Sequence, residues 1–226
     1  MKKKAVAVVM TAVMALGMVS AVSVQAGIED KTLIVGFDAE YPPYGYMDEN
    51  GEYTGFDLEL AQAVCDLEGW ELEKKPINWD SKDMELNSGS IDCIWNGFTM
   101  NGREDDYTFS EPYVDNSQVI VVADDSGIEK LTDLAGKTVG VQAASAALDL
   151  LQSEEEGGQK ELADTFGALN EFADYNTAFT ELQAGALDAL AIDVGVAKYQ
   201  LNSRGEGFKI LDETLNTEQY AIGFKK

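Results

Sequence analysis

The sequence predicts an α/β fold made of two lobes. Apolar segments typical of buried strands alternate with amphipathic segments typical of helices between residues 31 and 224. An internal sequence similarity supports two lobes, because LNSGSIDCIWNG at 86–97 resembles LQAGALDALAID at 182–193. Both copies read as a helix end, a glycine, an apolar residue, an aspartate and a strand. We therefore expect two lobes of similar build, each directing one strand end toward a shared cleft.

In the first half of the chain, strands are expected where apolar residues run together or alternate, and helices where they recur every three or four residues. The strand KTLIVG is followed by a loop and hairpin rich in proline, glycine and aromatic residues. The segment GFDLELAQAVCDL places Leu60, Val64 and Leu67 on one face, which predicts an amphipathic helix. The expected elements are strand 31–36, helix 55–67, strand 70–76, helix 81–87 and strand 91–95.

The second half alternates in the same way after a turn-like segment at 108–112. Ser145 follows a predicted strand directly and is the expected N-cap of the next helix. Asn176 is expected to cap a later helix, which Gly185 ends. The expected elements are strand 118–123, helix 131–136, strand 137–142, helix 146–152, strand 168–173, helix 176–184, strand 187–192, helix 194–201, strand 208–211 and strand 219–224.

The N-terminus has the pattern of a secretory signal peptide. MKKK is followed by an apolar run and by Val24-Gln25-Ala26 before a glycine. Cleavage after Ala26 is the favoured interpretation, because a soluble domain begins at once and small residues precede the cleavage point. A retained membrane anchor is the alternative, since the apolar run is long enough to span a bilayer. We expect an exported protein, periplasmic or associated with the cell surface.

Charge and composition exclude several classes of function. Without the three lysines of the signal segment, 13 basic residues face 41 acidic ones, a net charge of −28. Such a charge repels nucleic acid and anionic membrane surfaces, so neither is an expected partner. The chain has no histidine, which removes the commonest general base and the commonest metal ligand. Ser-His-Asp and Cys-His catalytic sites are thereby excluded, and we expect no metal and no cofactor.

The two cysteines, Cys65 and Cys93, leave two interpretations open. Export makes a disulfide possible. Each cysteine also lies in an apolar pattern, which is typical of a buried thiol acting as a small hydrophobic group.

The stretch IDCIWNGFTMNGRE at 91–104 carries residues that indicate a binding site. Its strand breaks at Asn96-Gly97, after which Thr99 supplies a hydroxyl and Arg103 a fixed cation. Open α/β sheets bind ligands at such strand ends, and a guanidinium pairs with a carboxylate through two hydrogen bonds. We therefore expect a pocket for a small molecule that bears a carboxylate. The amide groups at the helix start near Ser145 suit an anion, although a capped helix without a ligand is the plainer interpretation there.

Six motifs together resemble the extracellular solute-binding proteins for polar amino acids that serve ABC importers. They are VGFDAEYPPYGY at 35–46, GEYTGFDLELAQAV at 51–64, LNSGSIDCIWNGFT at 86–99, REDDYTFSEPY at 103–113, LTDLAGKTVGVQAASAALDLL at 131–151 and LQAGALDALAID at 182–193. The resemblance implies a type II periplasmic-binding-protein fold. In that fold two α/β lobes, joined by two crossover segments, close over the ligand.

The resemblance also implies residues that hold the ligand's head group. Arg103 matches the arginine that takes the α-carboxylate, although the spacing in TMNGR is one residue shorter than usual. Thr99 matches a hydroxyl that touches both ends of the head group, and the Gly97 carbonyl matches an acceptor for the ammonium. Asp193 matches the carboxylate that pairs with the ammonium from the opposite lobe. Because the carboxylate of a zwitterion needs a cation and hydrogen-bond donors, Thr99 is expected to help Arg103 bind it.

Five further residues are implied by the same resemblance. Ser145 and Ala146 match a pair of hydroxyl residues, and alanine replaces the second hydroxyl, so that only its backbone amide can donate. Tyr41 and Trp79 match aromatic residues that sandwich the ligand's side chain. Asp38 matches an acid at the floor of the side-chain pocket.

We expect a signal peptide at 1–26, a first lobe at 27–115 and a second lobe at 116–226 that includes the return strand near 219–224. The family has helices after the matching strand that pack on the first lobe. The sequence stops at Lys226, so about two helices, roughly 25–30 residues, are expected to be lacking. We expect apolar surface on the first lobe as a result.

The expected function is that of an exported, monomeric solute-binding protein that captures a polar amino acid in the interlobe cleft and delivers it to the permease of an ABC transporter. An enzyme on the same fold, such as a dehydratase, is an alternative, but no acid–base pair stands out. A sensory ligand-binding module is another. Asp38, Glu40 and Asp80 near the expected pocket indicate a ligand with a polar or cationic side chain.

Overall fold

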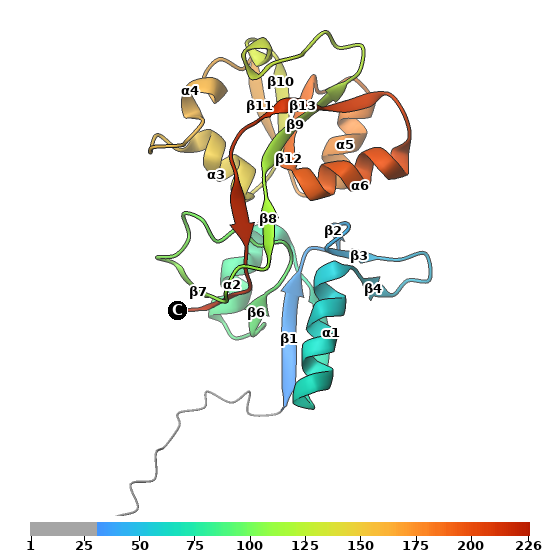
Figure 1. Ribbon diagram of the computed structural model, residues 1–226, viewed down its shortest axis with the longest axis vertical. Helices are drawn as coiled ribbons and strands as arrows, with labels where there is room; N and C mark the ends of the chain where they lie inside the picture. The colour runs from blue at the N-terminus through green and yellow to red at the C-terminus, as the bar shows by residue number, and fades with distance from the viewer. Residues whose placement is uncertain (1–30) are drawn as a thin grey trace, which may run out of the picture.

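The computed structural model describes residues 31–226, which form two α/β lobes stacked along the long axis of the molecule (Figure 1). The predicted signal peptide and residues 27–30 of the predicted first lobe lie outside the described residues. Within 31–226, no helix combines the length and the apolar character that crossing a membrane requires.

The first lobe is built on a five-stranded sheet with the order β5-β1-β6-β15-β7. The central strand β1 (Thr32–Phe37) pairs in parallel with β5 (Glu71–Pro76) and β6 (Cys93–Ile94). Strand β15 (Gly223–Lys225) lies between β6 and β7 (Tyr107–Phe109), antiparallel to both. The other elements are a small sheet of β2 (Glu40–Tyr41), β3 (Gly45–Met47) and β4 (Tyr53–Thr54), helices α1 (Phe56–Glu68) and α2 (Lys82–Asn87), and the 3-10 turn η1 (Trp79–Ser81).

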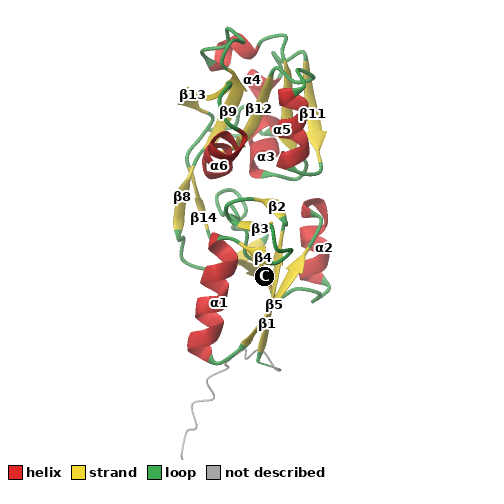
Figure 2. Cartoon of the chain, turned by 90° about the vertical axis from the view of Figure 1, so that its right-hand side faces the viewer, coloured by secondary structure: helices red, strands yellow, loops and turns green. Residues whose placement is uncertain are grey.

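The two faces of the first sheet are covered by different helices (Figure 2). Successive side chains of β1 point to opposite faces, so Val35 packs toward Leu58 of α1 and Ile34 packs toward Leu86 of α2. The apolar run of β1 that the sequence shows is therefore buried from both sides.

The second lobe repeats this plan with the strand order β11-β10-β12-β9-β13. Alternate residues of its central strands form two apolar clusters, one against α5 and α6 and one against α3. The strands are β9 (Gln118–Ala123), β10 (Thr138–Gln142), β11 (Ala168–Phe172), β12 (Ala189–Asp193) and β13 (Phe208–Thr214). The helices are the 3-10 turn η2 (Leu131–Leu134), α3 (Ala146–Gln152), α4 (Lys160–Ala163), α5 (Tyr175–Gln183) and α6 (Val194–Arg204).

Two antiparallel strands, β8 (Val114–Asn116) and β14 (Glu218–Tyr220), connect the lobes (Figure 1). They are the two crossover segments that the resemblance implies. The grouping of the return strand with the second lobe was wrong, because β15 completes the first sheet beside β6. The predicted strand 219–224 is divided at Ala221, whose amide donates to the Phe98 carbonyl at 3.0 Å and turns the chain into the first lobe.

Most predicted elements are present, with local differences. Helix α5 is capped by Asp174, whose carboxylate accepts from the Thr177 amide at 2.7 Å, rather than by Asn176. The short helix α4 was not predicted. Cys65 and Cys93 are both buried and free, so the thiol interpretation holds for this structure.

Candidate ligand-binding site

A small cavity lies between the lobes, where the carboxyl ends of several strands meet. Its free volume is only about 10 Å³, close to the space that the centre of one water molecule needs. Its lining residues are Tyr41, Trp79, Gly97, Thr99 and Arg103 from the first lobe, and Gln142, Ser145, Ala146 and Asp193 from the second. Eight of the nine residues predicted as a site therefore line one cavity, and access for an amino acid requires the lobes to move apart.

Arg103 supplies the positive end of this cavity. Its side chain is 12% exposed, and its guanidinium carbon lies 5.0 Å from the centre of the Phe98 ring. One guanidinium nitrogen is 2.7 Å from a carboxylate oxygen of Asp149, which belongs to α3 of the opposite lobe. The shortened spacing still brings Arg103 to the cavity, because its amide closes a tight turn onto the Met100 carbonyl at 3.0 Å.

Ser145 and Ala146 lie at the start of α3, on the same side of the cavity as Arg103. The Ser145 hydroxyl accepts from the Leu148 amide at 3.1 Å and is therefore used as a helix cap, as predicted. Ala144 before it has a φ of 54°, the left-handed conformation that glycine adopts most easily. Because α3 has only two turns, its dipole is small and Arg103 carries the local positive charge.

Asp193 supplies the negative end of the cavity, at the junction of β12 and α6. Its Oδ1 accepts from the Asn116 amide at 2.8 Å, the Gln118 amide at 2.7 Å and the Tyr220 hydroxyl at 2.6 Å. Burial and, after it, repulsion from Glu218 together raise the pKa of Asp193 to about 6. Oδ1 is thus saturated with donors, and Oδ2 receives no hydrogen bond from residues 31–226.

Glu218 is a second buried carboxylate in this network, and sequence reasoning missed it. It stands at the start of the crossover strand β14 and accepts from the Thr99 hydroxyl at 2.8 Å. The only sequence signal was an acid directly before the predicted return strand. Its partners Asn116 and Gln118 were missed for the same reason, since their roles depend on contacts between distant segments.

The aromatic residues Tyr41 and Trp79 are both buried at the cavity. The ammonium of the buried Lys82 lies 5.3 Å from the centre of the Trp79 ring and donates to the Ala144 carbonyl at 3.1 Å. This bond joins the two lobes, and Lys82 was not predicted. Burial lowers the pKa of Lys82, and the nearby Arg103 lowers it further.

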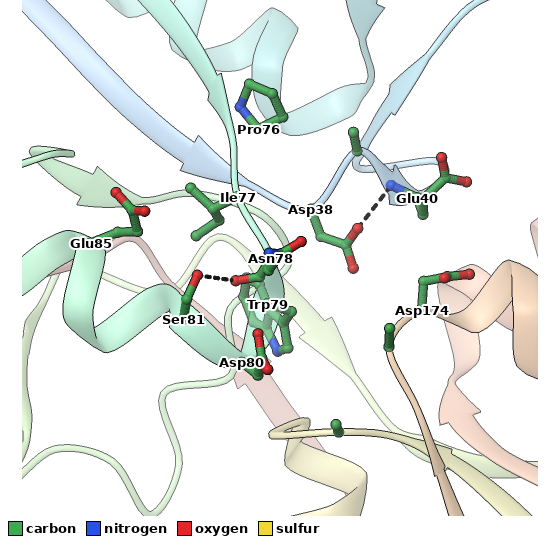
Figure 3. A pocket seen from close by; sticks show the side chains of 13 residues that line it. Asp38, Glu40, Pro76, Ile77, Asn78, Trp79, Asp80, Ser81, Glu85 and Asp174 are labelled. Carbon is green, nitrogen blue, oxygen red and sulfur yellow. Dashed lines mark hydrogen bonds between the residues drawn. The ribbon is translucent and has the colours of Figure 1, made fainter.

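Asp38 lies in a larger pocket of about 640 Å³ that shares Trp79 with the small cavity (Figure 3). Its Oδ2 accepts from the Gln142 amide at 2.7 Å, and burial raises its pKa to about 6. Figure 3 shows carboxylates from both lobes around this space, and none of the residues that line it is lysine or arginine. The acids are Asp38, Glu40, Asp80, Glu85 and Asp174.

No group of histidine, cysteine, aspartate or glutamate side chains that could hold a metal ion occurs among residues 31–226.

The sequence pattern of the bacterial extracellular solute-binding proteins, family 3, matches residues 33–200. The chain belongs to this family. The arginine-binding extracellular protein ArtP of Bacillus subtilis is 34% identical over 200 residues, covering 87% of this chain and 75% of ArtP.

Two further comparisons agree with membership of family 3. The L-cystine-binding protein TcyJ of Escherichia coli is 28% identical over 226 residues, covering 95% of this chain and 82% of TcyJ. A crystal structure of an ABC uptake transporter substrate-binding protein from Streptococcus pneumoniae with bound histidine superimposes with a TM-score of 0.80 at 35% identity. That superposition covers 87% of this chain and 80% of the other, which agrees with the type II periplasmic-binding-protein fold implied by the sequence.

Proposed function

We propose that this family 3 protein captures a polar amino acid by its zwitterionic head group and delivers it to the permease of an ABC importer. One observation carries the proposal: Arg103 and Asp193 come from opposite lobes and line the same cavity. A zwitterion between them would satisfy the guanidinium with its carboxylate and the aspartate with its ammonium. Binding the head group therefore favours the closed arrangement of the lobes.

The larger pocket that contains Asp38 supports a preference for a ligand with a cationic side chain. A side chain that extends from the head group past Trp79 would reach a space lined by five acids and no base. An attached cation gains from that field, whereas a carboxylate is repelled. The arginine-binding relative ArtP is in line with this preference. Export, which is expected from the predicted signal peptide, and action as a monomer complete the proposal.

The test is a thermal-shift and calorimetric screen of the twenty amino acids and cystine against the chain from residue 27 onward. Binding at 100 times the dissociation constant should add about 2.7 kcal/mol to the free energy of unfolding. Arginine and lysine are expected to bind more tightly than glutamine, and glutamate least tightly. The absence of any shift in a folded sample contradicts the proposal, and chemical conversion of a bound ligand indicates an enzyme instead.

The residue assignments have their own test. Arg103→Ala and Asp193→Ala should each weaken binding by about 2–5 kcal/mol, because each leaves the opposite charge of the ligand buried without a partner. Lys198→Ala is the matched control, since Lys198 is an exposed cation on α6 that does not line the cleft. Retained binding in Arg103→Ala would show that another group takes the carboxylate.

A further inference from the structure

One carboxylate oxygen of Glu218 contacts three donors that belong to three different parts of the molecule. Its Oε1 accepts from Thr99 of the first lobe, from Asn116 of the crossover strand β8 and from Gln118 of the second lobe, each at 2.8 Å. The side chain is buried, and its Oε2 accepts from the Asn216 amide at 3.1 Å. Both carboxylate oxygens are therefore used inside the protein.

The contact with Thr99 fixes what that hydroxyl can offer a ligand. A hydroxyl has one hydrogen and two lone pairs. The hydrogen of Thr99 is committed to Glu218, so Thr99 faces the cavity as an acceptor only. An acceptor suits the ammonium of an amino acid and does not suit its carboxylate. Thr99 therefore suits the ammonium end, which is one of the two head-group contacts that the resemblance implies for it.

Two amide groups link Glu218 to Asp193. The amide nitrogens of Asn116 and Gln118 each donate to both carboxylates, at 2.7–2.8 Å, which uses both hydrogens of each NH2 group. The amide oxygens of Asn116 and Gln118 are buried and have no partner within residues 31–226. The orientation of these amides is therefore set by the two carboxylates and not by their own oxygens.

We infer that Glu218 is a positioning residue that gives the ammonium end of the site its all-acceptor character. It acts through Thr99, from whose hydroxyl it accepts a hydrogen bond. It also acts through the two amides that hold Asp193, which leave one oxygen of that carboxylate for the ligand. The inference rests on the proposed function. Its consequence is selectivity for an α-amino acid over the α-hydroxy acid of the same side chain, since an ammonium supplies three hydrogens to this end and a hydroxyl supplies one.

The test compares dissociation constants of the best amino acid and its α-hydroxy analogue for wild type and Glu218→Gln, by calorimetry between pH 5 and pH 8. The glutamine keeps an acceptor for Thr99 and removes the charge, so affinity for the amino acid should fall about tenfold. Affinity should also persist to lower pH than in wild type, because repulsion by Glu218 no longer raises the pKa of Asp193. The other titratable groups that face Asp193 are the tyrosines Tyr41, Tyr44, Tyr175 and Tyr220. Their raised pKa values keep them neutral throughout this pH range.

Asp115→Asn is the matched control, because it removes an exposed carboxylate from the crossover strand β8 that contacts Gln219 and not Asp193. Its affinity and pH profile should equal those of wild type. If Glu218→Gln loses affinity for both analogues equally and keeps the wild-type pH profile, Glu218 is only a structural part of the crossover and the inference is wrong. A wild type that binds no amino acid overturns the proposed function and this inference together.

Thr99→Val tests the same inference without changing Glu218. Loss of the acceptor should weaken binding of the amino acid more than binding of the hydroxy acid, so the ratio of their dissociation constants moves toward one. An equal loss for both would mean that Thr99 donates to the carboxylate they share, which contradicts the inference.

Discussion

Asp57 is a buried carboxylate that holds the loop carrying Gly97. It stands in the first turn of α1, and its Oδ2 accepts from the Gly97 amide at 2.5 Å and from the Tyr113 hydroxyl at 2.9 Å. Gly97 has a φ of 57°, and its Cα lies so close to the Tyr41 and Tyr220 rings that an added Cβ would meet both at 3.0 Å. Asp57 thus fixes the backbone that forms one wall of the cavity.

Replacing Asp57 by alanine should lower the free energy of unfolding by about 1–3 kcal/mol, because two buried donors lose their acceptor. Asp57→Asn should cost less, since the amide oxygen can still accept from Gly97 and Tyr113. Ligand affinity should fall in the alanine variant and be largely retained in the asparagine variant. Urea unfolding and calorimetry measure the two effects. Equal behaviour of both variants would show that the contacts to Asp57 do not hold the loop.

At the scale of residues, the sequence predicted groups that carry their chemistry in a local motif. Arg103 and Asp193 each follow a recognisable strand end, and both line the cavity. Glu218, Gln118 and Lys82 could not be predicted in this way. Their roles arise from contacts between segments up to 119 residues apart, such as that of Glu218 with Thr99, and no local pattern encodes such a contact.

At the scale of elements, the first turn of α6 forms part of the contact between the lobes. Gly195 lies in this turn, and a Cβ at that position would stand 2.3 Å from the Tyr44 hydroxyl oxygen of the first lobe. Tyr44 is buried and packs against Tyr41 and Tyr220. The missing side chain at Gly195 therefore lets the lobes approach.

Gly195→Ala should separate closure from folding. Alanine is favoured over glycine inside a helix by about 1 kcal/mol, so the protein with its lobes apart, where position 195 does not meet Tyr44, should be unharmed or slightly more stable. Closure should become harder because the new methyl group meets Tyr44, and ligand affinity should fall by about tenfold, the effect of roughly 1.4 kcal/mol. Thermal unfolding and calorimetry give the two quantities.

Adding Tyr44→Phe to Gly195→Ala removes the nearest atom and should restore part of the affinity. Failure of the double variant to recover any affinity would place the effect elsewhere than in this contact.

The elements themselves were largely predictable, because both lobes bury alternating apolar patterns from both faces of a sheet. The lobe to which an element belongs was harder to predict. The return strand follows second-lobe elements in the sequence, but β15 fits between β6 and β7, where Gly223 lies against the Phe98 ring. This packing depends on the space between β6 and β7, which are distant from β15 in the sequence. The periodicity of apolar residues gives no information about that space.

At the scale of the whole molecule, three carboxylates share one property. Burial raises the pKa of Asp57 to about 7 and those of Asp38 and Asp193 to about 6, from an ordinary value of 3.8. Asp193 lines the cavity, Asp38 lines the larger pocket beside it, and Asp57 holds the loop that carries Gly97. The site is thus assembled from acids that the folded protein holds ionised at a cost in stability, in a chain with a formal charge of −25.

The free energy of unfolding of the ligand-free protein should fall as the pH rises from 5 to 8. Between about pH 4 and pH 7 the folded state binds more protons at these three acids than the unfolded state does, so each increment of pH favours unfolding. Urea titrations at several pH values measure the slope, and Asp57→Asn should flatten it in the upper part of the range. A free energy of unfolding that is constant or rises with pH would contradict this assignment.

Ligand affinity should follow the opposite trend over the same range, because an ammonium pairs with the ionised form of Asp193 and not with the protonated form. At low pH the ligand-free protein is the more stable, and at high pH the ligand binds the more tightly. The added stability from a fixed ligand concentration should therefore grow from pH 5 to pH 8. Thermal shifts with and without ligand at each pH measure this difference, and a shift independent of pH would show that Asp193 does not carry the ammonium contact.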